Sequence, residues 1–310
     1  MLDRRLFLGG SDAAAVLGVS SWTTPVELWR LKTGRVTPMP NYERDRRLER
    51  GKRLEGPICD MVVEKLRDEG HDVQVLARNE RYTDPEHAFL SCEIDMELLV
   101  DGEHVNADAK SVGGQARHKW GQEGTDEIPI DYLAQFMDGL MITGRQRCIA
   151  AALRSFDDVD IYWLTRDQET IDGMRAKMVS FWKDHVERDT PPDPVNFADL
   201  RSLFAKPEPR RVEATPEILE AVQELGQIKG RVEALEAREQ HLRFLIAKHM
   251  GPAETLASGV RDVMTWANEE RGRFELERFK REHPDWYALF TKKTTTRVLR
   301  RAKARSAGAR

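Results

Sequence analysis

The change of hydrophobic period near residue 71 is the feature that most constrains how this chain can fold. Residues 49–70 place apolar side chains at helical spacing, namely Leu54, Ile58, Met61, Val62 and Leu66. From residue 72 onward, apolar and polar residues alternate in three runs, VQVLARNERY, FLSCEIDMELLV and EHVNADAKSV, which turn-forming residues separate. The chain therefore predicts an amphipathic helix followed by an antiparallel meander of three strands.

Helix and strand signals continue on both sides of the meander. Upstream, Ser11-Asp12 and Thr24-Pro25 carry the cap chemistry that begins short helices. Downstream, we expect a helix over residues 129–143, two strand-like runs RCIAAALRSF and VDIYWLTR, and a helix over residues 167–188. The order helix, three strands, helix, two strands, helix predicts an α/β or α+β core over residues 1–190.

A different organisation is expected after this core. Residues 191–216 form a predicted proline-rich linker, and residues 217–250 carry apolar side chains at three- and four-residue steps, which is typical of a long helix. Two successive three-residue steps near Leu225 and Ile228 interrupt the heptad pattern, so a coiled coil and a helical hairpin both stay open. Residues 251–310 are expected to be a small C-terminal region with a basic tail.

Charge is distributed unevenly along the 310 residues. Residues 271–310 hold thirteen lysines and arginines against four acids, so this tail carries +9 in a chain whose net charge is -4. A basic tail on an acidic body is a weak indication of contact with phosphate.

Apolar run lengths and the cysteine count exclude several classes of protein. No run approaches the roughly 18 apolar residues of a membrane-spanning helix, and the N-terminal stretch MLDRRLFLGGSDAAAVLG is too polar for a signal peptide. We therefore expect a cytoplasmic protein that has no membrane partner. Cys59, Cys92 and Cys148 are then expected to be reduced, and without a CxxC pair they predict neither a structural zinc site nor an iron–sulfur cluster.

Three charged residues of the meander are candidates for chemistry. Asp95 lies inside an apolar strand, while Asp108 and Lys110 lie two residues apart on the next strand, where period two puts their side chains on one face. If the two strands pair through the turn at residues 101–102, Asp95 and Asp108 lie near opposite positions and need a compensating cation. Carboxylate oxygens are ligands that Mg²⁺ prefers, and Lys110 could then orient a nucleophilic water.

Several strings in a fixed order resemble one family. GGSDAAAVLG, WTTPVELWRLKTG, RGKRLEGPI, Asp95, Asp108-Ala109-Lys110 and PIDYLAQFMDGLMITG together resemble the YqaJ viral recombinase family, which is related to the lambda-type exonuclease within the PD-(D/E)XK nucleases. The resemblance covers about residues 4–190. It implies a PD-(D/E)XK restriction-endonuclease-like core with a central mixed sheet flanked by helices, to which the C-terminal helical or coiled-coil appendage is added.

The resemblance also implies a function. Such enzymes digest linear double-stranded DNA from the 5′ end with Mg²⁺, or alternatively Mn²⁺, and leave 3′ single strands for a single-strand annealing protein in phage-type recombination. They typically act as a ring-shaped homotrimer. The chain is accordingly expected to be a metal-dependent 5′→3′ exonuclease that binds double-stranded DNA ends.

Matching positions assign roles under this resemblance. Glu55, Asp95 and Asp108 would hold the metal, Lys110 would be the catalytic lysine, and Gln135 would reach the site from a helix. An aspartate at position 108 departs from the more frequent glutamate, which shortens the side chain but keeps its charge.

A pocket for a terminal 5′-phosphate is implied nearer the N-terminus. Ser11, with Arg4 or Arg5 upstream, resembles the residues that form it. A hydroxyl and backbone N–H groups at a glycine turn before a helix also favour an anion on physical grounds.

Aromatic residues are further candidates for contact with DNA. Trp120 lies with Arg117 and Lys119 in the polar stretch GGQARHKWGQEG, which is expected to be a DNA-facing loop. Trp22 and Trp29 are instead expected to pack in the core.

Two other functions stay open. An endonuclease of the same fold would cleave covalently closed circular DNA, which an exonuclease leaves intact. A catalytically inert DNA-binding scaffold would instead depend on residues 211–310, which hold the long helix and the basic tail.

Overall fold

Two compact units make up the chain. The computed structural model describes residues 3–36, 42–154, 158–300 and 302. The first unit is Met1–Ala205 and the second is Lys206–Arg310.

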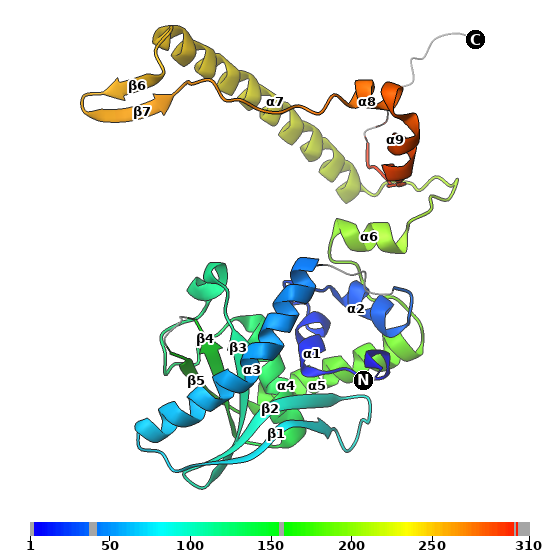
Figure 1. Cartoon of the computed structure of the whole chain (residues 1–310). Coiled ribbons are helices and arrows are strands. Elements are labelled where there is room, and N and C mark those ends of the chain that lie inside the picture. The colour runs from blue at the N-terminus through cyan, green and yellow to red at the C-terminus, as the bar shows by residue number, and fades with distance from the viewer. Residues whose placement is uncertain (1–2, 37–41, 155–157, 301, 303–310) are drawn as a thin grey trace. The chain divides into compact units, whose positions relative to one another are not determined.

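A five-stranded mixed sheet forms the centre of the first unit (Figure 1). The strands lie side by side in sequence order, β3 and β4 are parallel, and the other neighbours are antiparallel. Strand β3 therefore has a neighbour on each edge. The strands are β1 Val73–Thr83, β2 Ser91–Val100, β3 Glu103–Ser111, β4 Arg147–Leu153 and β5 Asp160–Thr165.

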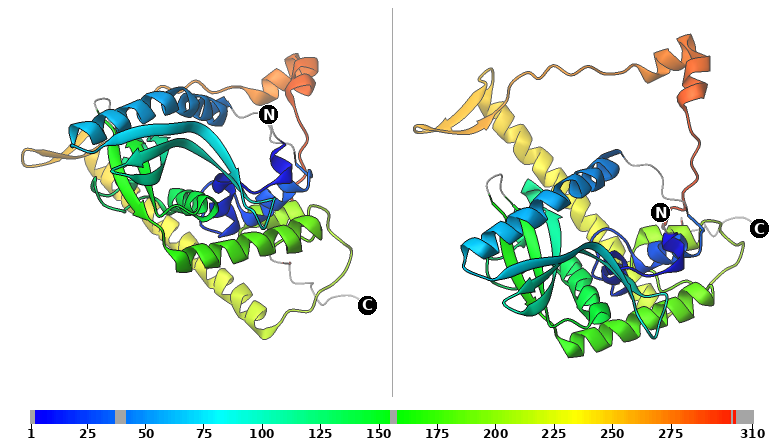
Figure 2. Two further views of the ribbon diagram at one scale, coloured as in Figure 1. Left: turned by 90° about the horizontal axis from the view of Figure 1, so that it is seen from below. Right: turned by 60° about the horizontal axis from the view of Figure 1, so that its bottom comes forward.

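Helices cover both faces of this sheet. Figure 2 shows α3 on one face and α4 and α5 on the other. A π-helical turn, η3, continues α5. The bounds are η1 Arg4–Leu6, α1 Gly10–Val16, α2 Pro25–Lys32, α3 Tyr42–Asp68, η2 Gly114–Lys119, α4 Ile130–Thr143, α5 Gln168–Ser180, η3 Phe181–Glu187 and α6 Phe197–Leu203.

Local sequence explains where two of these helices begin and end. The Thr24 hydroxyl accepts a hydrogen bond from the Glu27 N–H at 3.1 Å, and the Glu27 carboxylate accepts one from the Thr24 N–H at 3.0 Å. This capping box precedes α2. Helix α4 ends at Gly144, whose φ of 73° is a left-handed conformation that glycine adopts without strain.

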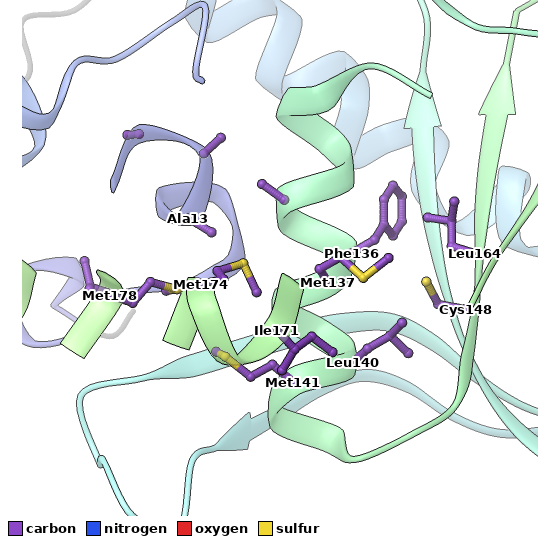
Figure 3. Close-up of a cluster of buried hydrophobic side chains, with 14 of the residues drawn as sticks. Ala13, Phe136, Met137, Leu140, Met141, Cys148, Leu164, Ile171, Met174 and Met178 are labelled. Carbon is purple, nitrogen blue, oxygen red and sulfur yellow. The ribbon is translucent and has the colours of Figure 1, made fainter. Parts of the chain in front are cut away.

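Two hydrophobic clusters hold the helices on the sheet. Helix α3 packs Val62 against the side chains of β2 and β3, including Met96. On the opposite face, Figure 3 shows α1, α4 and α5 meeting through Ala13, Leu140 and Met174. Because α1 and α4 share this cluster, the N-terminal segment is fixed to the helix that covers β3.

Helix α6 lies inside the segment that the sequence predicts to be a linker. Asn196 begins it by accepting a hydrogen bond from the Asp199 N–H at 2.9 Å. The Asp199 carboxylate, 1 % exposed, accepts a hydrogen bond from the Thr24 hydroxyl at 2.7 Å. This buried contact between distant residues ties α6 to the first unit, which extends to Ala205.

The second unit is built around one long helix. Thr215 accepts a hydrogen bond from the Ile218 N–H at its start, and Pro216 occupies the first helical position. Leu225 and Ile228 on this helix are 44 % and 45 % exposed, so a coiled-coil partner stays a prediction. The elements are α7 Pro216–Met250, β6 Thr255–Ser258, β7 Arg261–Thr265, α8 Leu276–Glu282 and α9 Pro284–Phe290.

The predicted fold class and element order of the first unit are confirmed. The meander, the helix after it, the two further strands and the closing helix all occur where the sequence predicts them. Helix α3 begins at Tyr42, earlier than the residue 49 at which its apolar spacing starts. The end of the predicted strand run RCIAAALRSF and the tail residues Arg301, Lys303, Arg305 and Arg310 lie outside the described residues.

Within the described ranges, no helix is both long enough and apolar enough to cross a bilayer.

Truncation of Leu140, which is 0 % exposed at the contact of α4 with α1 and α5, tests this packing. Leu140→Ala is expected to lower the free energy of unfolding by about 2–5 kcal/mol, because it removes buried methyl groups and leaves a cavity. Ile130→Ala, on the same helix at a position 54 % exposed, is the matched control and should cost much less. Urea denaturation measures both, and equal losses would contradict the assignment of this core.

Candidate active site

Strand β3 brings an acid and a lysine together beneath α4. Asp108 and Lys110 point to the same face of the sheet, and the Lys110 Nζ lies 3.8 Å from the nearer Asp108 carboxylate oxygen. Their side chains are 6 % and 13 % exposed, so this charged pair is held in a largely water-free environment. Period two on β3 predicted this shared face.

Asp95 lies on β2, next to the point where the pairing between β2 and β3 ends. The last paired residues are Met96 and Ala107, so Asp95 and Asp108 are the next positions along the two strands. The Asp95 carboxylate accepts a hydrogen bond from the Ala109 N–H at 2.9 Å. A side chain thus replaces a backbone partner there, which holds the Asp95 carboxylate beside the Asp108–Lys110 segment.

Glu55 approaches the same acids from α3. Burial raises the pKa of Glu55, the negative charge of Asp95 raises it further, and Lys110 opposes both effects. Burial likewise raises the pKa of Cys59, one turn later on α3, to about 12, and the charges of Asp95, Glu55 and Asp108 contribute. The mutual effects indicate that the three carboxylates and Lys110 form one electrostatic cluster.

Asp108 has a strongly raised pKa. Its pKa is raised to about 7, chiefly by burial and in addition by the negative charges of Asp95 and Glu55, against the lowering effect of Lys110. A raised pKa on a buried acid that has a specific charged partner is typical of functional sites, although ion-pair networks also produce it.

Aromatic rings of α4 fix the lysine. The Lys110 Nζ lies 5.3 Å from the centre of the Phe136 ring and 5.8 Å from that of Tyr132. A cation over aromatic rings is attracted by their electron-rich faces. These contacts hold the ammonium group on the side of β3 that Asp108 also occupies.

The donors in this cluster suit a hard cation. Mg²⁺ binds through one or two carboxylates, keeps several waters and takes further oxygens from a phosphate substrate. Asp95 and Asp108 supply two such carboxylates, and their excess of negative charge over Lys110 favours a cation. Among the residues that the structure describes, however, no three acidic, imidazole or thiol groups form a set that could hold a metal ion, so the expected three-acid set is not preformed.

Gln135 contacts α1 and is not seen bonded to the acids. Its Cγ lies 3.1 Å from the position that a Cβ at Gly10 would take. No hydrogen bond in the described parts of the chain joins Gln135 to Asp95, Asp108 or Glu55. Its expected role at the metal site stays a prediction.

The residues expected to form the phosphate pocket do line one cavity. Arg4, Arg5 and Ser11 surround a space of about 580 Å³ next to α1 and α2. The Arg4 guanidinium donates a hydrogen bond to the Ser11 hydroxyl at 2.7 Å. Arg5 is paired with Asp3 at 2.6 Å.

Helix α4 connects this cavity with the acid cluster. At its first turn, the Ser21 hydroxyl donates a hydrogen bond to the Asp131 carboxylate at 2.5 Å. Ser21 precedes Trp22, which lines the cavity. The next residue of α4, Tyr132, faces Lys110, so the first turn of this helix contacts Lys110 and also a residue adjacent to the cavity lining.

Sequence reasoning missed a residue of the cavity. Lys32 lines it, with a side chain only 3 % exposed. Lys32 follows Val26 and Trp29 at three-residue spacing on α2, so a lysine on the buried stripe of an amphipathic helix was the signal that could have identified it.

Two tryptophans lie in environments opposite to those expected. Trp120 is 4 % exposed and packs against Tyr132 and Tyr162, with ring centres 5.5 and 5.2 Å apart, so the expectation of DNA stacking at Trp120 is wrong. Trp22 is 67 % exposed, so the expectation that it packs in the core is also wrong, whereas Trp29, 5 % exposed, does so. The polar residues around Trp120 concealed its apolar partners, which come from distant segments.

The two basic residues beside Trp120 remain available to a partner. Arg117 and Lys119 lie on η2 and are exposed. Their expected contact with DNA is untested by this geometry and stays a prediction.

Comparison with known proteins identifies relatives of the chain. The model of the YqaJ-like viral recombinase domain matches residues 1–146. A Bacillus subtilis (strain 168) protein named "Uncharacterized protein YqaJ" is 26 % identical over 301 residues, which cover 95 % of this chain and 90 % of the relative. These two matches confirm the resemblance to the YqaJ family.

Solved structures with a similar chain path include two exonucleases. The alkaline exonuclease LHK-Exo from Laribacter hongkongensis has a TM-score of 0.44 at 16 % identity, and the match covers 60 % of this chain and 91 % of that one. A phage related exonuclease from Haemophilus somnus 129PT has a TM-score of 0.40 at 13 % identity, with 60 % and 96 % covered.

Asp108→Asn tests the burial of the carboxyl group through the pH dependence of stability without metal. The folded-state pKa is about 7 and the unfolded value is about 3.9. Below about pH 4 both states are protonated and Asp108 contributes no pH dependence; between about pH 4 and 7 only the unfolded state loses the proton, so stability falls as pH rises.

The asparagine of this variant cannot bind or release a proton, so the variant does not show the decrease in the free energy of unfolding that ionisation at this position causes in the wild type. Its free energy of unfolding relative to the wild type should therefore increase from pH 4 to pH 8 in EDTA, as measured by urea denaturation. A difference that stays constant over this range would contradict the raised pKa of Asp108.

Proposed function

We propose that residues 1–146, which match the model of the YqaJ-like viral recombinase domain, are the main part of a metal-dependent deoxyribonuclease that digests linear double-stranded DNA from its 5′ ends. The observation that carries the proposal is the buried Asp108–Lys110 pair beside Asp95 and Glu55. Such a cluster of acids with a lysine suits the hydrolysis of a phosphodiester. The phosphodiester is itself negatively charged, so a cation is needed to bind it next to the acids.

Each residue of the cluster has a task in this proposal. Asp95 and Asp108 would hold Mg²⁺, or Mn²⁺, with Glu55 as a third acid next to it. The bound ion would polarise the scissile phosphate and favour hydroxide over water as the nucleophile. Lys110, held by the rings of Phe136 and Tyr132, would orient the attacking water or stabilise the charge that develops on the phosphate oxygens.

The cavity near the N-terminus gives the proposed digestion its direction. Ser11, with Arg4 or Arg5, would bind the terminal 5′-phosphate, and Gln135 would reach the acid cluster from α4. Because α4 contacts both Lys110 and Ser21, which adjoins the cavity-lining Trp22, an end bound in the cavity would be held at a fixed distance from the acids. Arg117 and Lys119 on η2 would contact the DNA backbone.

The remaining parts of the proposal concern assembly. The 3′ single strand left by digestion would pass to a single-strand annealing protein in the cytoplasm of the host cell, and the enzyme would act as a homotrimer. Light scattering of the purified protein tests the trimer directly.

Digestion of end-labelled DNA tests the catalytic assignment. With Mg²⁺, the wild type is expected to shorten the 5′-phosphorylated strands of a linear duplex and to leave covalently closed circles intact. Lys110→Met should slow digestion by about 10²–10³-fold, the usual loss on removing one group that stabilises developing charge. Asp95→Asn should abolish it, because it removes a metal-binding carboxylate.

Controls separate catalysis from folding and from other cleavage modes. Glu64→Gln changes an exposed acid of α3 outside the cluster and should digest DNA like the wild type. EDTA should stop the reaction and excess Mg²⁺ should restore it. Undiminished digestion by Asp95→Asn would overturn the proposal, and cleavage of circles would replace it with an endonuclease.

A further inference from the structure

Lys32 is the most buried cation of the N-terminal cavity, and each of its donors is used. Its ammonium group donates hydrogen bonds to the carbonyl oxygen of Arg4 at 2.8 Å, to that of Phe7 at 2.6 Å and to the carboxylate of Asp12 at 2.6 Å. Burial lowers the pKa of Lys32, and the negative charge of Asp12 opposes this effect. One side chain of α2 thus joins η1, the strand-like segment after it and α1.

The charges around the cavity leave one cation in excess. Arg5 is paired with Asp3 at 2.6 Å, and Lys32 is paired with Asp12 at 2.6 Å. Arg4 makes a longer ion-pair contact with Asp12, at 3.6 Å, and donates a hydrogen bond to the neutral Ser11 hydroxyl at 2.7 Å. The guanidinium of Arg4 is also 66 % exposed at its side chain, so it can turn toward a ligand.

Asp12 would oppose an anionic ligand if it were not neutralised. Its carboxylate lies beside the Arg4 guanidinium and one residue after Ser11. A phosphate in the cavity would meet this negative charge at short range in a partly buried place, where charges are screened less than in water. The ion pair with Lys32, at 2.6 Å, opposes this repulsion.

The hydrogen bonds of Lys32 to the two carbonyl oxygens also hold the backbone that carries Arg4. They fix the backbone at residues 4 and 7, between which η1 forms. The side chain of Arg4 therefore starts from a fixed backbone and meets Ser11 at 2.7 Å. Loss of the ammonium group would free both the charge of Asp12 and the position of Arg4.

We propose that Lys32 is the positioning residue that makes this cavity selective for a terminal phosphomonoester, by neutralising Asp12 and by fixing the backbone that carries Arg4. This assignment rests on the proposed function because it takes the ligand of the cavity to be the phosphorylated end of DNA. It adds a residue to the site and a reason for its selectivity.

Binding in EDTA tests the assignment without any hydrolysis. Fluorescence anisotropy compares one linear duplex with 5′-phosphate ends and the same duplex with 5′-hydroxyl ends. The wild type should bind the phosphorylated duplex about tenfold more tightly, the effect of a typical charge-assisted hydrogen bond. Lys32→Met should bring the ratio of the two dissociation constants close to one, and Arg30→Met, which removes a cation of α2 outside the cavity, should leave it unchanged.

A double variant distinguishes neutralisation from general loss of structure. Asp12→Asn removes the charge that Lys32 balances, while its amide oxygen can still accept the hydrogen bond of the Gly9 N–H. Lys32→Met with Asp12→Asn should therefore recover a preference of several-fold for the phosphorylated end. A simple packing role for Lys32 predicts no such recovery.

The outcomes separate this assignment from the nuclease proposal. If Lys32→Met does not fold, Asp12→Asn alone should strengthen the preference for the phosphorylated end, and an unchanged or weaker preference would overturn the assignment. The assignment would also be overturned if the wild type bound both kinds of end equally, or if the Lys32→Met protein kept the full preference for the phosphorylated end. A wild type that prefers the phosphorylated end and digests no DNA would overturn the nuclease proposal alone.

Discussion

Burying a carboxylate costs free energy unless a cation or hydrogen-bond donors compensate it, and the first unit places Asp108 where this cost is high. Asp95 and Glu55 add negative charge, while Lys110 is the cation in contact with Asp108. Because the pKa of Asp108 is raised, this arrangement lowers the stability of the folded protein at neutral pH. The sheet, its two hydrophobic clusters and the rings that hold Lys110 are what keep these groups together against their repulsion.

Helix α4 is the element through which the two parts of the proposed site depend on one another. Its outer side packs with α1 and α5 through residues such as Leu140, and its first turns contact both Ser21 and Lys110. The same helix holds Asp138, which is 0 % exposed and whose two carboxylate oxygens lack a hydrogen-bond partner in the described part of the chain. Burial raises the pKa of Asp138 well above its ordinary range, so this part of the helix favours a neutral carboxyl group.

Local patterns predicted most of the fold and the strands that carry the acid cluster, because period two and helical spacing indicate directly which face of an element is buried. Asp108 and Lys110 were found this way. Contacts between distant segments were not predictable, since no local pattern reports them. Trp120 is surrounded by polar neighbours in sequence yet packs between tyrosines from elsewhere, and Lys32 shows its importance only once Arg4 and Asp12 lie beside it.

Strand β4 borders the acid cluster without supplying any of its charged groups. Strand β4 runs parallel to β3 and sets Ala150 and Ala152 directly beside Asp108 and Lys110. Neighbouring strands are about 4.8 Å apart, so larger side chains at these two alanines would occupy the volume into which the acid and the amine extend. A methyl group at each position leaves lateral clearance, and because both alanines are 0 % exposed, a larger side chain and an unpaired polar one would each be costly there.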